Sequence, residues 1–184
     1  MTFSNDYFKK QILPDLKKKY SFKNDLQVPK IEKIVINAGI GNLVKESKDN
    51  LDIILADMVK IAGQKPQVIK SKKAISGFKL RPGDVVGLKA TLRGDRMYDF
   101  LEKLIKIAFP RIRDFRGIKK STVDKNGNIN IGIKEHSVFP EIKIEEVKKV
   151  FGLQISIKTN AKTKMQALNL IKAFGAVFEK PAKK

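Results

Sequence analysis

The chain has 184 residues and carries 39 Lys or Arg against 19 Asp or Glu, a formal net charge of +20. Cysteine is absent, which excludes disulfides, zinc–thiolate sites and cysteine nucleophiles. Because so large an excess of positive charge repels itself, we expect a polyanionic partner, with nucleic acid first and an anionic membrane surface second. No apolar run is long enough to span a membrane, and the N-terminus resembles neither a secretory signal nor a transit peptide.

The N-terminal half of the sequence predicts two helices and two strands. Apolar residues at helical spacing cover residues 3–20, with a kink or restart at Pro14. The other predicted elements are a strand over 30–39, a helix over 51–62 that stops at Gly63, and a short strand over 66–70. Gly39 and Gly41, at the end of the first strand, are interpreted as permitting a tight turn or a close approach of the backbone to a ligand.

The C-terminal half mixes alternating strands with helices. Residues 85–93 alternate apolar and polar side chains, and Asp95 is predicted to cap a helix that Pro110 ends. An irregular stretch over 110–128 follows, and its Asn-Gly turn leads into a strand over 129–134. A further alternating strand covers 153–159, and a final helix runs from a capping box at Thr163 and Gln166 to Gly175.

These elements predict an α+β fold, with a largely antiparallel sheet and helices packed on one of its faces. The length suggests one domain or a tightly joined pair, and we expect one domain over residues 1–184. A long basic loop over 70–83 is expected to protrude from it, and the tail over 179–184 is expected to fray.

The second face of the sheet is predicted to be polar and basic. Backbone and shape recognition of folded RNA is expected here, because the face lacks paired aromatics that stack bases. An ordinary solvated face is the alternative. The side chains assigned to this face are Lys33, Asn37, Lys89, Thr91, Arg93, Gln154, Ser156 and Lys158.

The loop "KSKKAISGFKLRPG" over 70–83 has five basic residues and no acid. Three apolar residues, Ile75, Phe78 and Leu80, lie among these charges, and each needs a surface to pack against. Ile75 and Phe78 could pack on a ribose or stack on a base, or they could pack back on the protein. A solvated surface loop is the alternative for the whole segment.

Three other features are candidate sites. "AGIGNLV" lacks the third glycine of a dinucleotide-binding loop, because Val44 occupies that position. "FPRIRDFRG" over 109–117 groups arginines with an aromatic residue, which suits RNA binding, protein docking or a structural Arg–Asp pair. His136, the only histidine, lies near Glu135 and Glu141, and a structural role is favoured over catalysis. No catalytic residue, metal site or cofactor is therefore predicted.

Seven collinear segments resemble the family of bacterial large-subunit ribosomal protein five, which binds 5S ribosomal RNA. The match covers about residues 5–178. The segments are "KIVINAGIG", "AGQKP", "KKAISGFKLRPG", "TLRGDRMYDFLEKLI", "FPRIRDFRG", "NGNINIGIKEHSVFPEI" and "FGLQISI". His136, Val85 and Phe109 depart from the family's pattern.

The resemblance implies three contact regions. For 5S RNA it implies the sheet face and adjoining loops, namely Lys33, Asn37, Gly39, Gln64, Lys65, Lys89, Thr91 and Arg93. For the elbow of P-site tRNA it implies Lys70, Lys72, Lys73, Ile75, Ser76, Gly77, Phe78, Lys79 and Arg81. For a bridge to small-subunit ribosomal protein thirteen it implies Arg111, Arg113, Asp114, Phe115 and Arg116, with the 134–144 region.

The expected function is that of a non-enzymatic structural protein of the large ribosomal subunit, located in the cytoplasm. It would attach 5S RNA to 23S RNA in the central protuberance, beside neighbouring ribosomal proteins. An RNA-modifying enzyme is the alternative, and it would need a cofactor loop or catalytic cluster that the sequence lacks. A peripheral membrane protein is a third possibility, which the alternating strands disfavour.

Overall fold

The computed structural model describes residues 3–47, 49–78, 80–143, 145 and 147–179. The chain divides into two compact units. The first comprises Met1–Ile34, Leu92–Ile131 and Ser156–Lys184, and the second comprises Val35–Thr91 and Gly132–Ile155. That residues 1–184 form one domain stays a prediction. The expected protrusion of the 70–83 loop also stays a prediction, and residues 180–184 of the expected frayed tail lie outside the described residues.

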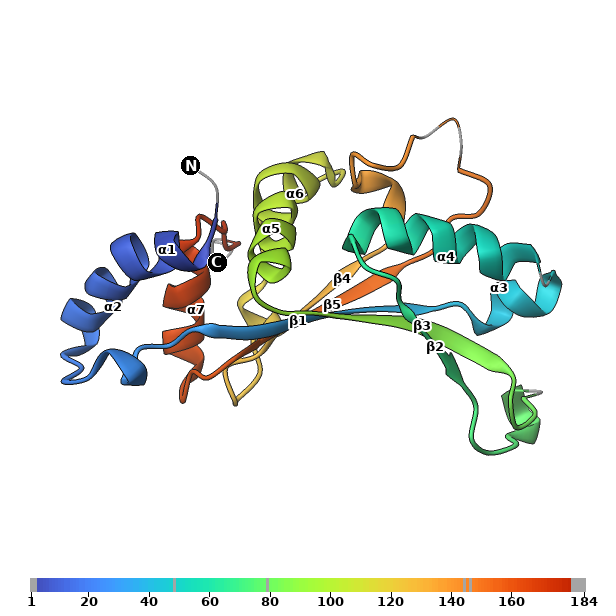
Figure 1. Ribbon diagram of the computed structural model, residues 1–184, viewed down its shortest axis with the longest axis horizontal. Coiled ribbons are helices and arrows are strands. Elements are labelled where there is room, and N and C mark those ends of the chain that lie inside the picture. The colour runs from blue at the N-terminus through green and yellow to red at the C-terminus, as the bar shows by residue number, and fades with distance from the viewer. Residues whose placement is uncertain (1–2, 48, 79, 144, 146, 180–184) are drawn as a thin grey trace, which may run out of the picture. The chain divides into compact units, whose positions relative to one another are not determined.

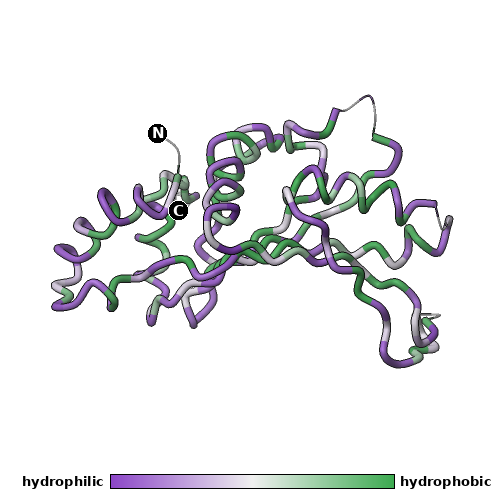
Figure 2. Tube along the Cα trace, viewed as in Figure 1, coloured by the Kyte–Doolittle hydropathy of each residue, from purple (hydrophilic) through white to green (hydrophobic). Residues whose placement is uncertain are grey.

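The strands form a five-stranded sheet in the order β2-β3-β1-β5-β4. The predicted α+β fold with an antiparallel sheet is confirmed. The strands are β1 (Ile31–Gly39), β2 (Gln67–Lys70), β3 (Val85–Leu92), β4 (Ile129–Ile133) and β5 (Leu153–Thr159). In β5, Leu153, Ile155 and Ile157 are buried while Gln154 and Lys158 are exposed, so the predicted alternation is correct. Figure 2 shows this mixing of hydrophobic and hydrophilic residues along the strands.

In the second unit, helices α3 (Gly41–Glu46) and α4 (Asp49–Ala62) lie on the same side of β2 and β3 (Figure 1). The predicted helix corresponds to α4, whose Ile54, Met58 and Ile61 are fully buried. It ends before Gly63, which has φ +62°. Helix α3 was not predicted, because its glycine and its short length weaken the helical pattern of "GNLVKE".

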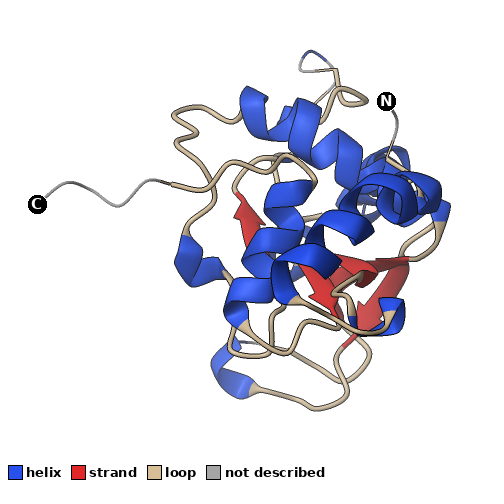
Figure 3. Cartoon of the chain, turned by 90° about the vertical axis from the view of Figure 1, so that its left-hand side faces the viewer, coloured by secondary structure: helices blue, strands red, loops and turns tan. Residues whose placement is uncertain are grey.

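In the first unit, α1 (Asn5–Tyr7) and α2 (Leu13–Tyr20) are joined by a π-helical turn over Phe8–Ile12. Pro14 lies at the start of α2, directly after the π-helical turn, so the predicted kink or restart appears as a π-helical turn within a continuous helical backbone. These helices pack on α7 (Lys164–Ala173), and the rings of Phe3 and Phe8 lie 5.3 and 6.4 Å from that of Phe174. The helices are drawn in blue in Figure 3.

The predicted third helix is α5 (Asp95–Lys103), followed by a π-helical turn over Leu104–Ala108 and by α6 (Phe109–Arg111). Two details differ from the prediction. Gly94, with φ +59°, is the N-cap of α5, and Asp95 is its first helical residue. The helix ends at Arg111, one residue after Pro110, which lies within α6 directly after the π-helical turn.

The turn before β4 is built as predicted. Gly127 has φ +78°, and the carboxylate of Asp124 accepts hydrogen bonds from the Asn128 backbone N–H at 2.7 Å and from its side-chain amide at 3.0 Å. Burial acts to raise the pKa of Asp124, but these bonds and those from the N–H groups of Asn126 and Gly127 outweigh it, so the pKa is lowered.

The C-terminal end of α7 matches the prediction, whereas the predicted capping box at its start is half formed. Thr163 Oγ1 accepts the N–H of Gln166 at 3.3 Å. The Gln166 side chain accepts the N–H of Lys162 rather than that of the cap residue itself. Gly175, at φ +91°, turns the chain back after the helix.

Candidate nucleic-acid interface

Four predicted RNA-contacting residues on β1 and β3 lie opposite the core of the second unit. On β1, Asn37 is half-buried and Gly39 is exposed, whereas the intervening Ala38 is fully buried. On β3, Lys89 is exposed and Thr91 is half-buried. Because successive strand residues point to opposite faces, these side chains project away from the buried residues.

Gln64 and Lys65 follow α4 and belong to the same unit. The Gln64 side-chain amide donates to the carbonyl oxygen of Thr91 at 3.5 Å, so the end of the helix is brought beside the end of β3. Lys65 is exposed. The structure therefore brings together amide, hydroxyl and ammonium groups, which are the donors that bind phosphate and ribose oxygens.

Strands β1 and β3 approach each other closely at Gly87. A Cβ atom on Gly87 would lie 2.7 Å from the carbonyl oxygen of Ala38, whereas a Cβ on Gly39 would meet nothing within 4 Å. Gly39 is thus open on the polar face. The expected tight turn or close approach of a ligand at Gly39 and Gly41 stays a prediction, and the tight contact between β1 and β3 lies at Gly87.

Lys33 and Arg93 belong to the first unit. Lys33 is half-buried on β1, and Arg93 is exposed directly after β3. In the same unit the ammonium group of Lys158 lies 3.3 Å from the carboxylate of Glu32, and Ser156 Oγ bonds Asn130 at 2.7 Å. Lys158, which the sequence assigned to the polar face, is therefore partly neutralised by a neighbouring acid.

The basic loop connects β2 to β3 (Figure 1). Backbone hydrogen bonds hold it together. At its base, Ser71 N–H donates to Asp84 at 2.7 Å and Gly83 N–H donates to Ser71 at 2.9 Å. Nearer the tip, Ile75 and Leu80 exchange two bonds of 3.1 Å. The segment is an extension of the hairpin rather than an irregular loop.

The tip of this loop is a 3₁₀ turn over Ser76–Phe78. Ile75 is 46% exposed, and Lys72, Lys73, Ser76 and Gly77 are exposed as well. An apolar side chain is thus open to solvent among lysines. The remaining members of the predicted set include Lys70 and Arg81, both exposed. Lys79 and the side chain of Phe78 lie outside the described residues.

The arginine cluster follows α6. Arg111, Arg113 and Arg116 are exposed, and Asp114 is exposed in a left-handed conformation at φ +57°. Phe115 is half-buried and stacks on Phe109, with ring centroids 5.0 Å apart. One aromatic residue therefore anchors the segment to the protein and leaves the guanidinium groups in solvent.

His136 is fully buried, at the start of a 3₁₀ turn over His136–Val138. Its Nδ1 accepts the N–H of Phe151 at 3.4 Å, and its Nε2 lies 3.6 Å from the carboxylate of Asp57. Burial lowers the pKa of His136 and outweighs the opposing effect of Asp57. The residue joins α4 to the segment before β5, as a structural histidine would.

The structure also identifies residues that the sequence reasoning missed. Ser71 and Asp84 close the basic loop, and Asp84 Oδ2 accepts the N–H of Arg81 at 2.7 Å. Asp84 is the single acid between Gln64 and Arg93, and this isolation among basic residues was the one sequence signal that could have identified it.

Within the described ranges, His, Asp and Glu residues form no cluster that could hold a metal ion. The helices of these ranges also lack the length and apolar character of a membrane-spanning segment.

Family models and individual relatives both match this chain to one ribosomal protein family. A family model described as "Ribosomal protein L5" matches residues 24–81, and the model of the C-terminus of the same ribosomal protein family matches residues 85–178. The chain is 46% identical over 178 residues to the large ribosomal subunit protein uL5 of Halothermothrix orenii, covering 97% of this chain and 99% of that relative. It is 50% identical over 173 residues to the protein of the same name from Pediococcus pentosaceus, covering 94% and 96% respectively.

Proposed function

The chain belongs to the ribosomal protein L5 family, and from that premise we propose that it binds 5S ribosomal RNA through the polar face of its sheet. Membership makes the chain a structural constituent of the large subunit of the bacterial cytoplasmic ribosome, and not an enzyme.

One observation carries the proposal. In the second unit, Asn37, Gln64, Lys65, Lys89 and Thr91 lie on or beside the strand face opposite the buried residues. Their groups complement phosphate and ribose oxygens, and the described part of this face lacks the paired aromatics of a base-stacking sheet. We therefore expect binding through the RNA backbone and its shape. Gly39, Lys33 and Arg93 are proposed as further contacts, the last two from the first unit.

The basic loop over 70–83 is proposed to contact the P-site tRNA. Its exposed lysines would lie at phosphates, and Ile75 would pack against a ribose or base. The hydrogen bonds that close the hairpin support this, because a tip already held in place loses less entropy on binding. Apolar side chains at the tip would then serve the RNA rather than the protein's own core.

The arginine cluster over 111–116, with the 134–144 region, is proposed to bridge to small-subunit ribosomal protein thirteen. The exposed guanidinium groups and the Phe115–Phe109 stack support a docking role. Contact with 23S RNA and with neighbouring proteins of the central protuberance completes the proposed set of partners.

The test is filter binding of the full chain to 5S ribosomal RNA across a salt series, with excess bulk tRNA as competitor. We expect binding that survives the competitor, with a log–log salt slope of about −0.7 to −0.9 for each phosphate contact. If bulk tRNA competes equally, the chain binds polyanions without specificity and the assignment to 5S RNA fails.

A further inference from the structure

A groove beside α7, within the first unit, is not used by the proposed 5S RNA face. It has a volume of about 620 Å³ and is lined by Met165, Leu168 and Lys172 of α7, by Val177 and Phe178 of the returning chain, and by Lys120. We call it the α7 groove. Its size falls in the range of sites that hold small organic groups.

The groove is built by ordered backbone. Gly175, at φ +91°, reverses the chain, and the following segment pairs with Ile118. Ile118 N–H donates to Val177 at 2.8 Å, and Glu179 N–H donates to Ile118 at 3.0 Å. A Cβ atom on Gly117 would lie 2.6 Å from the backbone of Phe178, so the two segments are in tight contact.

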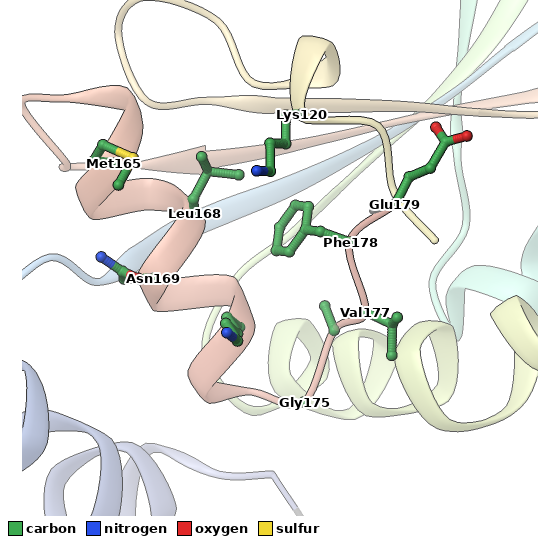
Figure 4. Close-up of a pocket in the computed structure, with 10 residues that line it drawn as sticks. Lys120, Met165, Leu168, Asn169, Gly175, Val177, Phe178 and Glu179 are labelled. Atoms are coloured by element: carbon green, nitrogen blue, oxygen red, sulfur yellow. The ribbon is translucent and has the colours of Figure 1, made fainter. Parts of the chain in front are cut away.

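The lining combines exposed apolar side chains with ammonium groups. Met165 is 63% exposed and Val177 is 62% exposed, so two large apolar side chains of the lining, which also includes Phe178, are open to solvent. Figure 4 shows the Lys120 side chain directed toward Leu168 and Phe178, and the Glu179 carboxylate directed away from the ring.

The charge of the surrounding chain favours an anionic occupant for the α7 groove. Residues 115–123 and 160–178 supply three basic residues each and contain no Asp or Glu, so among the described residues that line the groove Glu179 is the one acid against Lys120 and Lys172. An anionic partner with a flat apolar part fits both the lysines and the ring, and an unpaired nucleotide has that composition. A protein segment with apolar side chains could fill the apolar lining. It would not carry the regularly spaced phosphates that the lysines can bind.

We propose that the α7 groove binds an unpaired nucleotide of ribosomal RNA. Its base stacks on Phe178 and packs against Met165 and Val177, and its flanking phosphates lie at Lys120 and Lys172. This inference rests on family membership and on the groove itself, so it stands whether or not 5S RNA binding is found.

The first experiment is photo-crosslinking in assembled large subunits. Benzoylphenylalanine replaces Met165 in one full-length chain and Val177 in another, and the unsubstituted chain is the control. We expect an adduct that ribonuclease shortens, from at least one position. An adduct with another ribosomal protein alone would assign the groove to protein docking, and the absence of any adduct from both positions would show an unoccupied groove; each result overturns the proposal.

The second experiment uses the crosslinked RNA segment, made as a short oligonucleotide with 2-aminopurine at the crosslinked position. Binding to the full chain should quench the fluorescence, and Phe178→Leu should weaken binding about tenfold by removing the stacking ring. Lys172→Gln should reduce the salt slope by about 0.7. Leu26→Ala, at an apolar residue of the same unit that is 78% exposed, is the matched control and should change neither. Equal affinity for the Phe178→Leu chain would exclude stacking in the groove.

Discussion

The ring of His136 stacks on the ring of Phe151, with centroids 4.0 Å apart and planes inclined by 14°. The histidine is fully enclosed, and its free edge faces the carboxylate of Asp57 on α4 at 3.6 Å. No hydrogen-bond partner for Nε2 is found within the described part of the chain. A neutral imidazole suits this setting, because protonation would place a charge in a buried and incompletely bonded position.

We predict that this histidine makes stability depend on pH. Its pKa is lowered in the folded state, so the unfolded chain binds more protons as the pH falls below about 6.5. The free energy of unfolding should be constant above that pH and should decrease between about pH 6.5 and the lowered folded pKa. Each unit of lowering corresponds to about 1.4 kcal/mol.

Urea denaturation at pH 5.5 and 7.5 measures the effect, with His136→Gln as the comparison. Because the chain has a single histidine, the variant should lose most of the difference in this window. An unchanged difference in the variant would place the titrating group elsewhere.

Substitution of Gly87 should be costly. In Gly87→Ala the new methyl group would lie 2.7 Å from the carbonyl oxygen of Ala38, and a backbone atom paired in a sheet cannot move away cheaply. We expect a loss of about 1–3 kcal/mol from this overpacking. The matched control is Gly132→Ala in β4, where a Cβ would meet nothing within 4 Å, and equal urea midpoints for the two variants would contradict the prediction.

The basic loop should be ordered without RNA. The amides of Ile75 and Leu80 each donate to the other's carbonyl at 3.1 Å, so both should exchange with deuterium at least about tenfold more slowly than in an unstructured peptide. Asp84→Ala removes the carboxylate that accepts the Arg81 N–H and should accelerate exchange in the loop. Free exchange at both amides in the unsubstituted chain would show that RNA is needed to order the segment.

Lys89 should contribute one phosphate contact to 5S RNA binding. It is exposed on the polar face of β3, so Lys89→Gln should weaken binding and reduce the log–log salt slope by about 0.9. Lys148→Gln, which removes an exposed lysine outside the proposed contacts, is the matched control. If both variants shift the slope equally, the charge acts through the net field and not through a site on β3.

Local patterns accounted for most of the secondary structure. In β5 and α4 most of the buried residues are apolar residues of the sequence pattern. The sequence was therefore sufficient to predict both elements. The short helix α3 and the position of Pro110 inside α6 were missed. A helix of one or two turns carries little periodic signal. A proline usually indicates the end of a helix, and the sequence does not show the π-helical turn that precedes Pro110 in the structure.

The sequence by itself determined the class of the protein: a basic chain with an alternating sheet, and a set of motifs that identified its family. Tertiary structure decided what those residues contact. The bonds from Ser71 to Asp84 and from Ile118 to Val177, and the burial of His136 against Phe151, join positions 13 to 59 residues apart. Periodicity reports burial along one element, whereas such pairings depend on how separate elements pack, so only the folded chain shows the closed basic loop and the α7 groove.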